Sequence, residues 1–245
     1  MLLRPSPLLR PGPLLRLLST SPPPPSQAAS LSLDLPSLRN TFLGLRHGNS
    51  EANQLGVVSS SPAVATVSHG LSPLGVSQAT ASALAFAGQV KLERYSENVR
   101  IVTSDFLRAR ATADVLFSKY SNSDVDILTC NLVDDERLRE RFFGELDGGP
   151  DDRYQEVWDL DEKDAGHTEM GVESVNSVLA RTTELVRELD EAEEGRCYVL
   201  VAHGDVLQIL QTAFKGIGGE RHRSLQHLET AEIREFHMLP VARRW

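Results

Sequence analysis

The stretch Thr-Phe-Leu-Gly-Leu-Arg-His-Gly, residues 41–48, begins with a short apolar run and ends on a histidine held between arginine and glycine. Residues 197–205, Cys-Tyr-Val-Leu-Val-Ala-His-Gly-Asp, repeat this order much later in the chain. Short apolar runs of this kind are typical of buried strands. Two such strand ends would carry the imidazoles of His47 and His203, and we expect the two rings to meet in one site.

Strand and helix signals alternate along the chain around these two runs. The expected strands are 41–45, 99–103, 126–132, 197–202 and 231–236, and the expected helices are 72–94, 106–120, 172–189 and 206–214. Ser72-Pro73 marks the first helix start, with a capping hydroxyl followed by proline at the first helical position. Strands separated by helices predict an α/β fold for residues 34–245, a three-layer α/β/α sandwich around a mostly parallel central sheet.

The first 33 residues differ in composition from the rest of the chain. They are rich in Leu, Pro and Ser, and their only charged residues are Arg4, Arg10 and Arg16. This composition is typical of a mitochondrial or chloroplast transit peptide, and the frequent prolines oppose a secretory signal or a stable helix. We expect an organellar protein, in the mitochondrion or the plastid. A disordered tail on a cytoplasmic protein is the alternative.

The charge of the chain is strongly negative and unevenly distributed. The formal net charge is −9, and the three N-terminal arginines leave −12 for residues 34–245. So acidic a domain is unsuited to nucleic acid, whose phosphates require clustered Lys and Arg. No apolar run approaches the ~20 residues that cross a bilayer, so no membrane partner is expected. Cys130 and Cys197 lack CxxC spacing and predict buried thiols.

The residues at the strand ends suit a phosphate ester. A phosphomonoester is a dianion near neutral pH, so its pocket needs several cationic donors. Arg46 and Arg108 offer planar guanidinium groups that match phosphoryl oxygens, and His203 can add a donor. Gly204 leaves its backbone N–H open at a helix start, where anions are favoured. Arg108 as a solvated surface charge is the alternative.

His47 and Glu140 are the candidate reacting groups. A neutral imidazole of His47 can attack phosphorus to give a phosphohistidine, which water later cleaves. An alkoxide leaves with difficulty, so a general acid is needed, and burial beside phosphate would raise the pKa of Glu140 toward neutrality. Glu140 lies in a charged run and could instead be a surface residue, as Asp105 could simply cap a helix.

No cofactor or metal is expected. His222 and His227 are five residues apart in an Arg-rich loop, and His69 and His167 stand alone in loops. These positions do not have the regular spacing of zinc ligands. The predicted chemistry therefore belongs to a metal-independent enzyme.

Ordered motifs in the chain resemble those of the histidine phosphatase superfamily, which includes the cofactor-dependent phosphoglycerate mutases. Residues 45–53, Leu-Arg-His-Gly-Asn-Ser-Glu-Ala-Asn, resemble its RHGxSxxN signature. In family order, residues 71–79 resemble LTxxGxxQA, 104–113 resemble SDLxRAxQTA, 138–148 resemble LxERxxGxLxG, 171–174 resemble GxES, and 201–204 match the second histidine. The resemblance covers about residues 40–236.

The resemblance implies a phosphate pocket made of Arg46, His47, Arg108 and His203, with Asn53 as a further polar contact, and assigns the catalytic acid to Glu140. The sequence departs from the family motifs at two places, both of which concern the part of the pocket that would contact the substrate beyond its phosphate. Phe142-Phe143 stands where mutases usually carry His-Tyr, and Arg110-Ala111 replaces a residue followed by Gln.

The sequence favours a phosphatase over a mutase. Family mutases carry a long insertion between the acid and the second histidine, whereas only 63 positions separate Glu140 from His203. This short segment over the pocket favours water as the acceptor of the phosphoryl group. Residues 144–170 are placed to cover the pocket, which favours a small phosphorylated substrate. The alternatives are a phosphoglycerate mutase, a protein phosphatase and a phosphate-binding protein. Nothing in the sequence indicates an oligomeric state.

Overall fold

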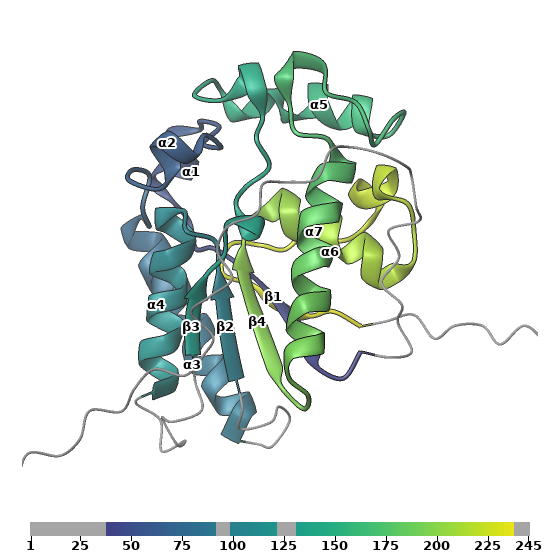
Figure 1. Cartoon of the computed structure of the whole chain (residues 1–245). Helices are drawn as coiled ribbons and strands as arrows, with labels where there is room; N and C mark the ends of the chain where they lie inside the picture. The colour runs from purple at the N-terminus through teal and green to yellow at the C-terminus, as the bar shows by residue number, and fades with distance from the viewer. Residues whose placement is uncertain (1–37, 92–98, 122–130, 238–245) are drawn as a thin grey trace, which may run out of the picture. The chain divides into compact units, whose positions relative to one another are not determined.

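The two apolar runs that end in histidine form adjacent strands of a computed structural model (Figure 1). Strand β1 (Thr41–Arg46) pairs in parallel with β4 (Cys197–Ala202), in a register that sets Arg46 opposite Ala202. The sheet also contains β2 (Val99–Thr103), β3 (Asn131–Asp134) and β5 (Ile233–Glu235), in the order β3-β2-β4-β1-β5. Only β5 runs antiparallel, so the mostly parallel sheet is confirmed.

The structure describes residues 38–91, 99–121 and 131–237, all within one compact unit. Several predictions concern residues outside this described part: the transit peptide, residues 92–94 of the expected first helix, residues 126–130 of the expected third strand, and Cys130. The α-helices are α1 (Glu51–Leu55), α2 (Pro62–Ala65), α3 (Pro73–Lys91), α4 (Leu107–Ser121), α5 (Tyr154–Asp161), α6 (Val175–Ala192) and α7 (Gly204–Lys215). The 3₁₀ helices are η4 (Glu136–Leu138), η5 (Gly144–Leu146), η6 (Asp151–Arg153), η7 (Glu169–Gly171) and η8 (Gly219–Ser224). Within the described ranges, no helix combines the length and apolar character of a membrane span.

Helices cover both faces of the sheet, because alternate strand residues face opposite sides. Phe42 and Leu200 belong to a core cluster shared with α6 and α7, whereas Leu43 and Val199 belong to a second cluster shared with α3 and α4. Figure 1 shows these helix pairs on either side of the strands. The predicted three-layer α/β/α arrangement is therefore confirmed. Helix α6 begins at Val175 rather than 172, because the Ser174 hydroxyl caps it.

Residues 144–170, for which the sequence predicts no regular element, form a segment that we call the roof. It contains η5, η6 and α5 and lies beyond the carboxyl ends of the strands (Figure 1). The roof is fastened at its start: Asp147 Oδ1 accepts hydrogen bonds from Ser60 N (2.6 Å), Ser60 Oγ (2.8 Å) and Ser61 N (3.0 Å). Backbone hydrogen bonds join Val58 to the glycines that follow Asp147. The roof is thus a fixed part of the domain.

The loop after β1 packs directly on the first turn of α3. Ser72 Oγ accepts from Gly75 N (3.1 Å) and donates to Asn49 Oδ1 (2.7 Å). The backbones approach so closely that a Cβ on Gly48 would lie 2.6 Å from the Gly75 carbonyl oxygen. A Cβ on Gly75 would overlap the carbonyl oxygen of Asn49. Glycine is required at both positions because backbone atoms cannot move aside as a flexible side chain can.

We expect Gly75→Ala to destabilise the protein by about 2–4 kcal/mol, because the new methyl group must push two backbone segments apart. Gly88→Ala is the matched control on the same helix, since a Cβ there meets no atom within 4 Å. That change should stabilise the protein by about 1 kcal/mol through helix propensity. Urea unfolding of the two variants measures both effects. Equal effects of the two changes would contradict the tight contact.

Candidate active site

The parallel pair β1 and β4 delivers two histidines to one place. His47 N donates to the Ala202 carbonyl oxygen (3.0 Å), which continues the strand pairing one residue beyond β1. His203 follows β4 directly and occupies the N-cap position of α7. The two ring centroids are 5.2 Å apart, and the side chains are 3% and 0% exposed. The structure therefore brings together the two imidazoles that the sequence singled out.

The His47 ring is held by one hydrogen bond at each nitrogen. Nδ1 lies 2.8 Å from the Gly48 carbonyl oxygen, and Arg108 Nε donates to Nε2 (3.1 Å). An arginine nitrogen cannot accept, so Nε2 accepts and the ring proton belongs on Nδ1. Burial lowers the pKa of His47 well below its ordinary value, and the nearby charges of Arg108 and Arg46 lower it further. The imidazole is therefore neutral, with a lone pair on Nε2.

Three buried donors around this ring lack partners. Arg46 ends β1, and its Nη1 donates to His227 Nε2 (2.7 Å) and to the Leu228 carbonyl oxygen (2.9 Å). Arg108, in the first turn of α4, is 3% exposed, so its alternative as a solvated surface charge is wrong. Across the described part of the chain, no hydrogen-bond partner exists for Arg46 Nε, Arg108 Nη1 or His203 Nδ1. Unpartnered buried donors are costly, above all the two on arginine cations, and an anion would satisfy all three.

His203 is oriented by the end of β2. Ser104 Oγ accepts from Phe106 N (3.2 Å) and can donate its own proton to His203 Nε2 (2.9 Å), which leaves the single ring proton of a neutral His203 on Nδ1. That nitrogen is 4.0 Å from Glu140 Oε2. Burial lowers the pKa of His203 well below its ordinary value, with Arg108 and His47 adding to the effect. The site thus holds two neutral imidazoles beside two permanent cations.

Glu140 is fixed between two anchored arginines. Arg139 Nε and Nη2 donate to the Asp105 carboxylate (2.8 and 2.6 Å), which ties this loop to the end of β2. Arg141 Nη1 and Nη2 donate to the Asp161 carboxylate (2.6 and 2.7 Å), which ties it to the end of α5. Glu140 itself is 11% exposed, so its alternative as a surface residue is wrong.

The environment of Glu140 favours its protonated form. Burial raises the pKa of Glu140 to about 7, against the opposing charge of Arg108, and the carboxylate of Asp205 contributes to the increase. Glu140 Oε1 accepts from the backbone N of Arg141 (3.0 Å). A carboxyl group with this pKa can donate and accept a proton near neutral pH.

Arg141 also joins the roof to the base of α7. It is fully buried, and its Nη1 reaches Asp205 Oδ2 (3.3 Å) as well as Asp161. Asp205 Oδ1 accepts from the indole Nε1 of Trp158 (3.2 Å), and Asp161 Oδ1 is 2.7 Å from His167 Nε2. Breaking one partner of such a buried pair is strongly destabilising. Arg141 therefore ties the loop that carries Glu140 both to the roof and to the first turn of α7.

One cavity of about 190 Å³ opens onto these groups. Its walls include the predicted site residues Arg46, His47, Asn53, Arg108, Glu140 and Gly204. Gly204 is needed here, because a Cβ would lie 2.7 Å from His227 Cε1 and 3.3 Å from Arg46 Nε. Asn53 reaches the cavity from α1, but its Oδ1 accepts from Ser50 N (3.0 Å) and completes a capping box.

The roof and the η8 loop add lining residues that sequence reasoning missed. Asp151, Tyr154 and Trp158 come from the roof, and His227 follows η8. Burial, together with the charges of Arg46 and Arg223, lowers the pKa of His227 to about 4, so it accepts from Arg46 as a neutral ring. No motif marks these positions. Only the alternation of aromatic and acidic residues in 151–161 is unusual for a surface loop.

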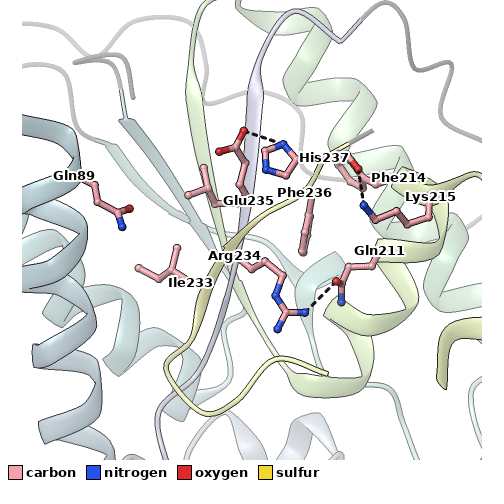
Figure 2. Close-up of a pocket in the computed structure, with 10 residues that line it drawn as sticks. Gln89, Gln211, Phe214, Lys215, Ile233, Arg234, Glu235, Phe236 and His237 are labelled. Atoms are coloured by element: carbon pink, nitrogen blue, oxygen red, sulfur yellow. Dashed lines mark hydrogen bonds and ion pairs between the residues drawn. The ribbon is translucent and has the colours of Figure 1, made fainter. Parts of the chain in front are cut away.

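A second cavity, of about 370 Å³, lies between β5, α7 and α3 (Figure 2). Figure 2 shows that its polar groups pair with one another: Arg234 Nη1 donates to Gln211 Oε1 (3.3 Å), and His237 Nδ1 is 3.3 Å from Glu235 Oε1. Lys215 Nζ donates to the His237 carbonyl oxygen (3.2 Å). Its lining contains neither His47 nor His203, so the smaller cavity is the candidate active site.

Comparisons with known proteins agree with this geometry. Mycobacterial glucosyl-3-phosphoglycerate phosphatase, in its complex with VO3, aligns with TM-score 0.64 and 26% identity, over 80% of this chain and 90% of that chain. A protein described as mycobacterial hydrolase 1 aligns with TM-score 0.63 and 26% identity, over 80% and 87%. A putative alpha-ribazole-5'-P phosphatase from Escherichia coli, at 18% identity, shares the fold, with TM-score 0.57 over 80% and 89%.

No curated protein sequence matches this chain. Residues 43–241, however, match the family described as the histidine phosphatase superfamily (branch 1). The matched range begins within β1. It contains His47 and His203, Arg46 and Arg108, and the loop that carries Glu140. The protein therefore belongs to branch 1 of the histidine phosphatase superfamily.

Proposed function

We propose that this protein is a phosphomonoester hydrolase that acts on a small phosphorylated metabolite through a phosphohistidine on His47. The observation that carries the proposal is the set of three unpartnered buried donors, Arg46 Nε, Arg108 Nη1 and His203 Nδ1, around the lone pair of His47 Nε2. A phosphoryl group would receive a hydrogen bond from each. The mycobacterial neighbour has also been solved with inorganic phosphate, which supports an anion site in this fold.

The first step transfers the phosphoryl group to the protein. As the ester binds, its oxygens take the donors of Arg46 and Arg108, and a bond forms between His47 Nε2 and phosphorus. The bond from phosphorus to the leaving oxygen breaks, and Glu140 gives that oxygen its proton. The Nδ1–H bond to the Gly48 carbonyl oxygen stabilises the positive charge that develops on the ring. The Asn53 amide is placed to contact the ester from α1.

The second step returns the protein to its starting state. Glu140, now a carboxylate, takes a proton from water as the water oxygen bonds to phosphorus. The bond between phosphorus and His47 Nε2 breaks, and inorganic phosphate leaves. The two guanidinium groups balance the charge of the phosphoryl group throughout, so we propose a reaction that needs no metal ion.

Three observations favour hydrolysis of a small substrate over the alternatives. A cavity of about 190 Å³ is smaller than the usual range for drug-sized ligands and does not suit a folded phosphoprotein. The roof is fastened by Asp147 and by the buried Arg141, so it is not placed to swing aside for a protein chain. The short interval between Glu140 and His203 supports water as the acceptor in place of a second phosphorylated molecule.

The test of this proposal is phosphate release by the full chain, with and without a chelator, beside His47→Ala. Removing the nucleophile should lower release by at least about 10³-fold. Release that survives the chelator and vanishes with the substitution is the expected result. His237→Ala is the control, because His237 is a solvent-exposed histidine outside the cavity lining. Interconversion of 2- and 3-phosphoglycerate without phosphate release would show that the mutase alternative is correct.

Glu140 should set the alkaline limb of the pH profile. Its carboxyl group is protonated below its pKa of about 7, so kcat/KM for an alkyl phosphate should fall as the pH rises above 7. Glu140→Gln should remove this limb and lower kcat/KM, which reports the first step alone, by about 10²–10⁴-fold for alkyl phosphates. p-Nitrophenolate leaves without a proton, so kcat/KM for p-nitrophenyl phosphate should fall far less. Equal losses on both esters would exclude Glu140 as the acid.

A further inference from the structure

We propose that the roof end of the active-site cavity selects phosphomonoesters whose alcohol is neutral and hydroxylated, and rejects those that carry a carboxylate. The inference rests on the proposed function and names its substrate class. It concerns the walls contributed by the roof and α7, which do not surround His47 directly.

Charge is divided between the two ends of the cavity. Of the residues that line it, Arg46 and Arg108 are the only arginines or lysines, and both lie at the phosphate end beside His47. The roof contributes Asp151, and the first turn of α7 contributes Asp205. A substrate carboxylate at the roof end would therefore face like charges, and the cavity lining offers it no cation there, which opposes its binding. The nearby Arg223 guanidinium is not a lining residue: it lies over the Trp158 ring and donates to Gln208 Oε1.

The two roof-end carboxylates differ in their partners. Asp205 is already bound by Trp158 Nε1 (3.2 Å) and by Arg141 Nη1 (3.3 Å), so it is fixed in place. The Asp151 backbone N donates to the Gly56 carbonyl oxygen (2.9 Å), but within the described ranges its carboxylate has neither hydrogen bond nor ion pair. An unpaired carboxylate is an acceptor only, and the hydroxyl groups of a polyol are donors that match it.

Aromatic rings complete the roof end. Tyr154 and Trp158 are one helical turn apart on α5 and stack with ring centroids 5.4 Å apart and planes 13° apart. Phe143 packs edge-on against Tyr154, with centroids 4.6 Å apart. Flat aromatic surface beside a few polar acceptors is the usual lining of a pocket for an amphipathic organic group. The Arg223 guanidinium covers the Trp158 ring, 3.6 Å from its centroid, so the C–H side of a sugar or polyol would meet the part of these rings that lines the cavity, with its hydroxyls turned to Asp151.

The experiment compares kcat/KM of the full chain on esters that differ in one group. Glycerol 3-phosphate and 3-phosphoglycerate differ by a hydroxymethyl and a carboxylate, and glucose 6-phosphate and phosphoglycolate extend the two classes. We expect the neutral esters to be preferred by at least about tenfold. Asp151→Asn should reduce this preference severalfold by improving the carboxylate-bearing esters. Asp152→Asn removes an exposed charge outside the cavity lining and should leave the preference unchanged.

p-Nitrophenyl phosphate separates the two proposals. If the protein releases no phosphate even from this activated ester, the proposed function fails, and the specificity inference fails with it. If this ester is hydrolysed but 3-phosphoglycerate equals or exceeds glycerol 3-phosphate, only the specificity inference is overturned. The specificity inference alone is also overturned if Asp151→Asn and Asp152→Asn have equal effects. It is likewise overturned if neither the neutral esters nor the carboxylate-bearing esters are hydrolysed.

Discussion

The parallel pairing of β1 with β4 is the constraint on which the site depends. Its register places Arg46 opposite Ala202, and the ladder continues one residue further through the hydrogen bond from His47 N to the Ala202 carbonyl oxygen. Two segments more than 150 residues apart in sequence therefore end side by side. A shift of one residue would turn the side chains of a strand to its other face, so the buried faces of both strands hold the two imidazoles in register.

The site concentrates buried positive charge, and removing this charge from water costs folding free energy. Arg46 and Arg108 lie among neutral rings, where few carboxylates compensate them, and Glu140 itself tends to stay protonated. Donors held this way need no rearrangement when negative charge arrives, which is the basis of electrostatic preorganisation. Such a pocket lowers the stability of the native state. Burial of the two apolar clusters on either side of the sheet offsets this loss.

The sequence predicts the parts of this protein that depend on local pattern. The apolar runs of β1, β2 and β4 and the amphipathic α6 can be recognised because burial on a sheet face or along one helix face imposes a period. The histidines and arginines at strand ends follow from the same logic, because parallel strands open at one edge. Cap residues account for the shifted start of α6, where the Ser174 hydroxyl outweighs the apolar pattern.

The parts that the sequence does not predict depend on contacts between distant segments. His227 becomes part of the site because Arg46 reaches it across 181 residues, and no spacing rule encodes such a contact. Asn53 lies at the cavity as expected, but its side-chain oxygen Oδ1 accepts from Ser50 N and caps α1. The roof contains too little apolar periodicity to predict α5. Its position is set by the ion pair of Arg141 with Asp161, whose partners are 20 residues apart.

That ion pair has a consequence for how the protein can change over evolution. Asp161 closes α5 and faces the buried arginine, whereas Tyr154 and Trp158 lie on earlier turns and face the cavity. The anchor at Asp161 and the cavity-facing Tyr154 are therefore different positions of one short segment, whereas Trp158 has both roles because its Nε1 also donates to Asp205. Under the proposed function, a substitution at Tyr154 would change the alcohol end of the cavity while the ion pair that holds the Glu140 loop stays intact. The proposed selectivity could then change during evolution without a change in the proposed chemistry.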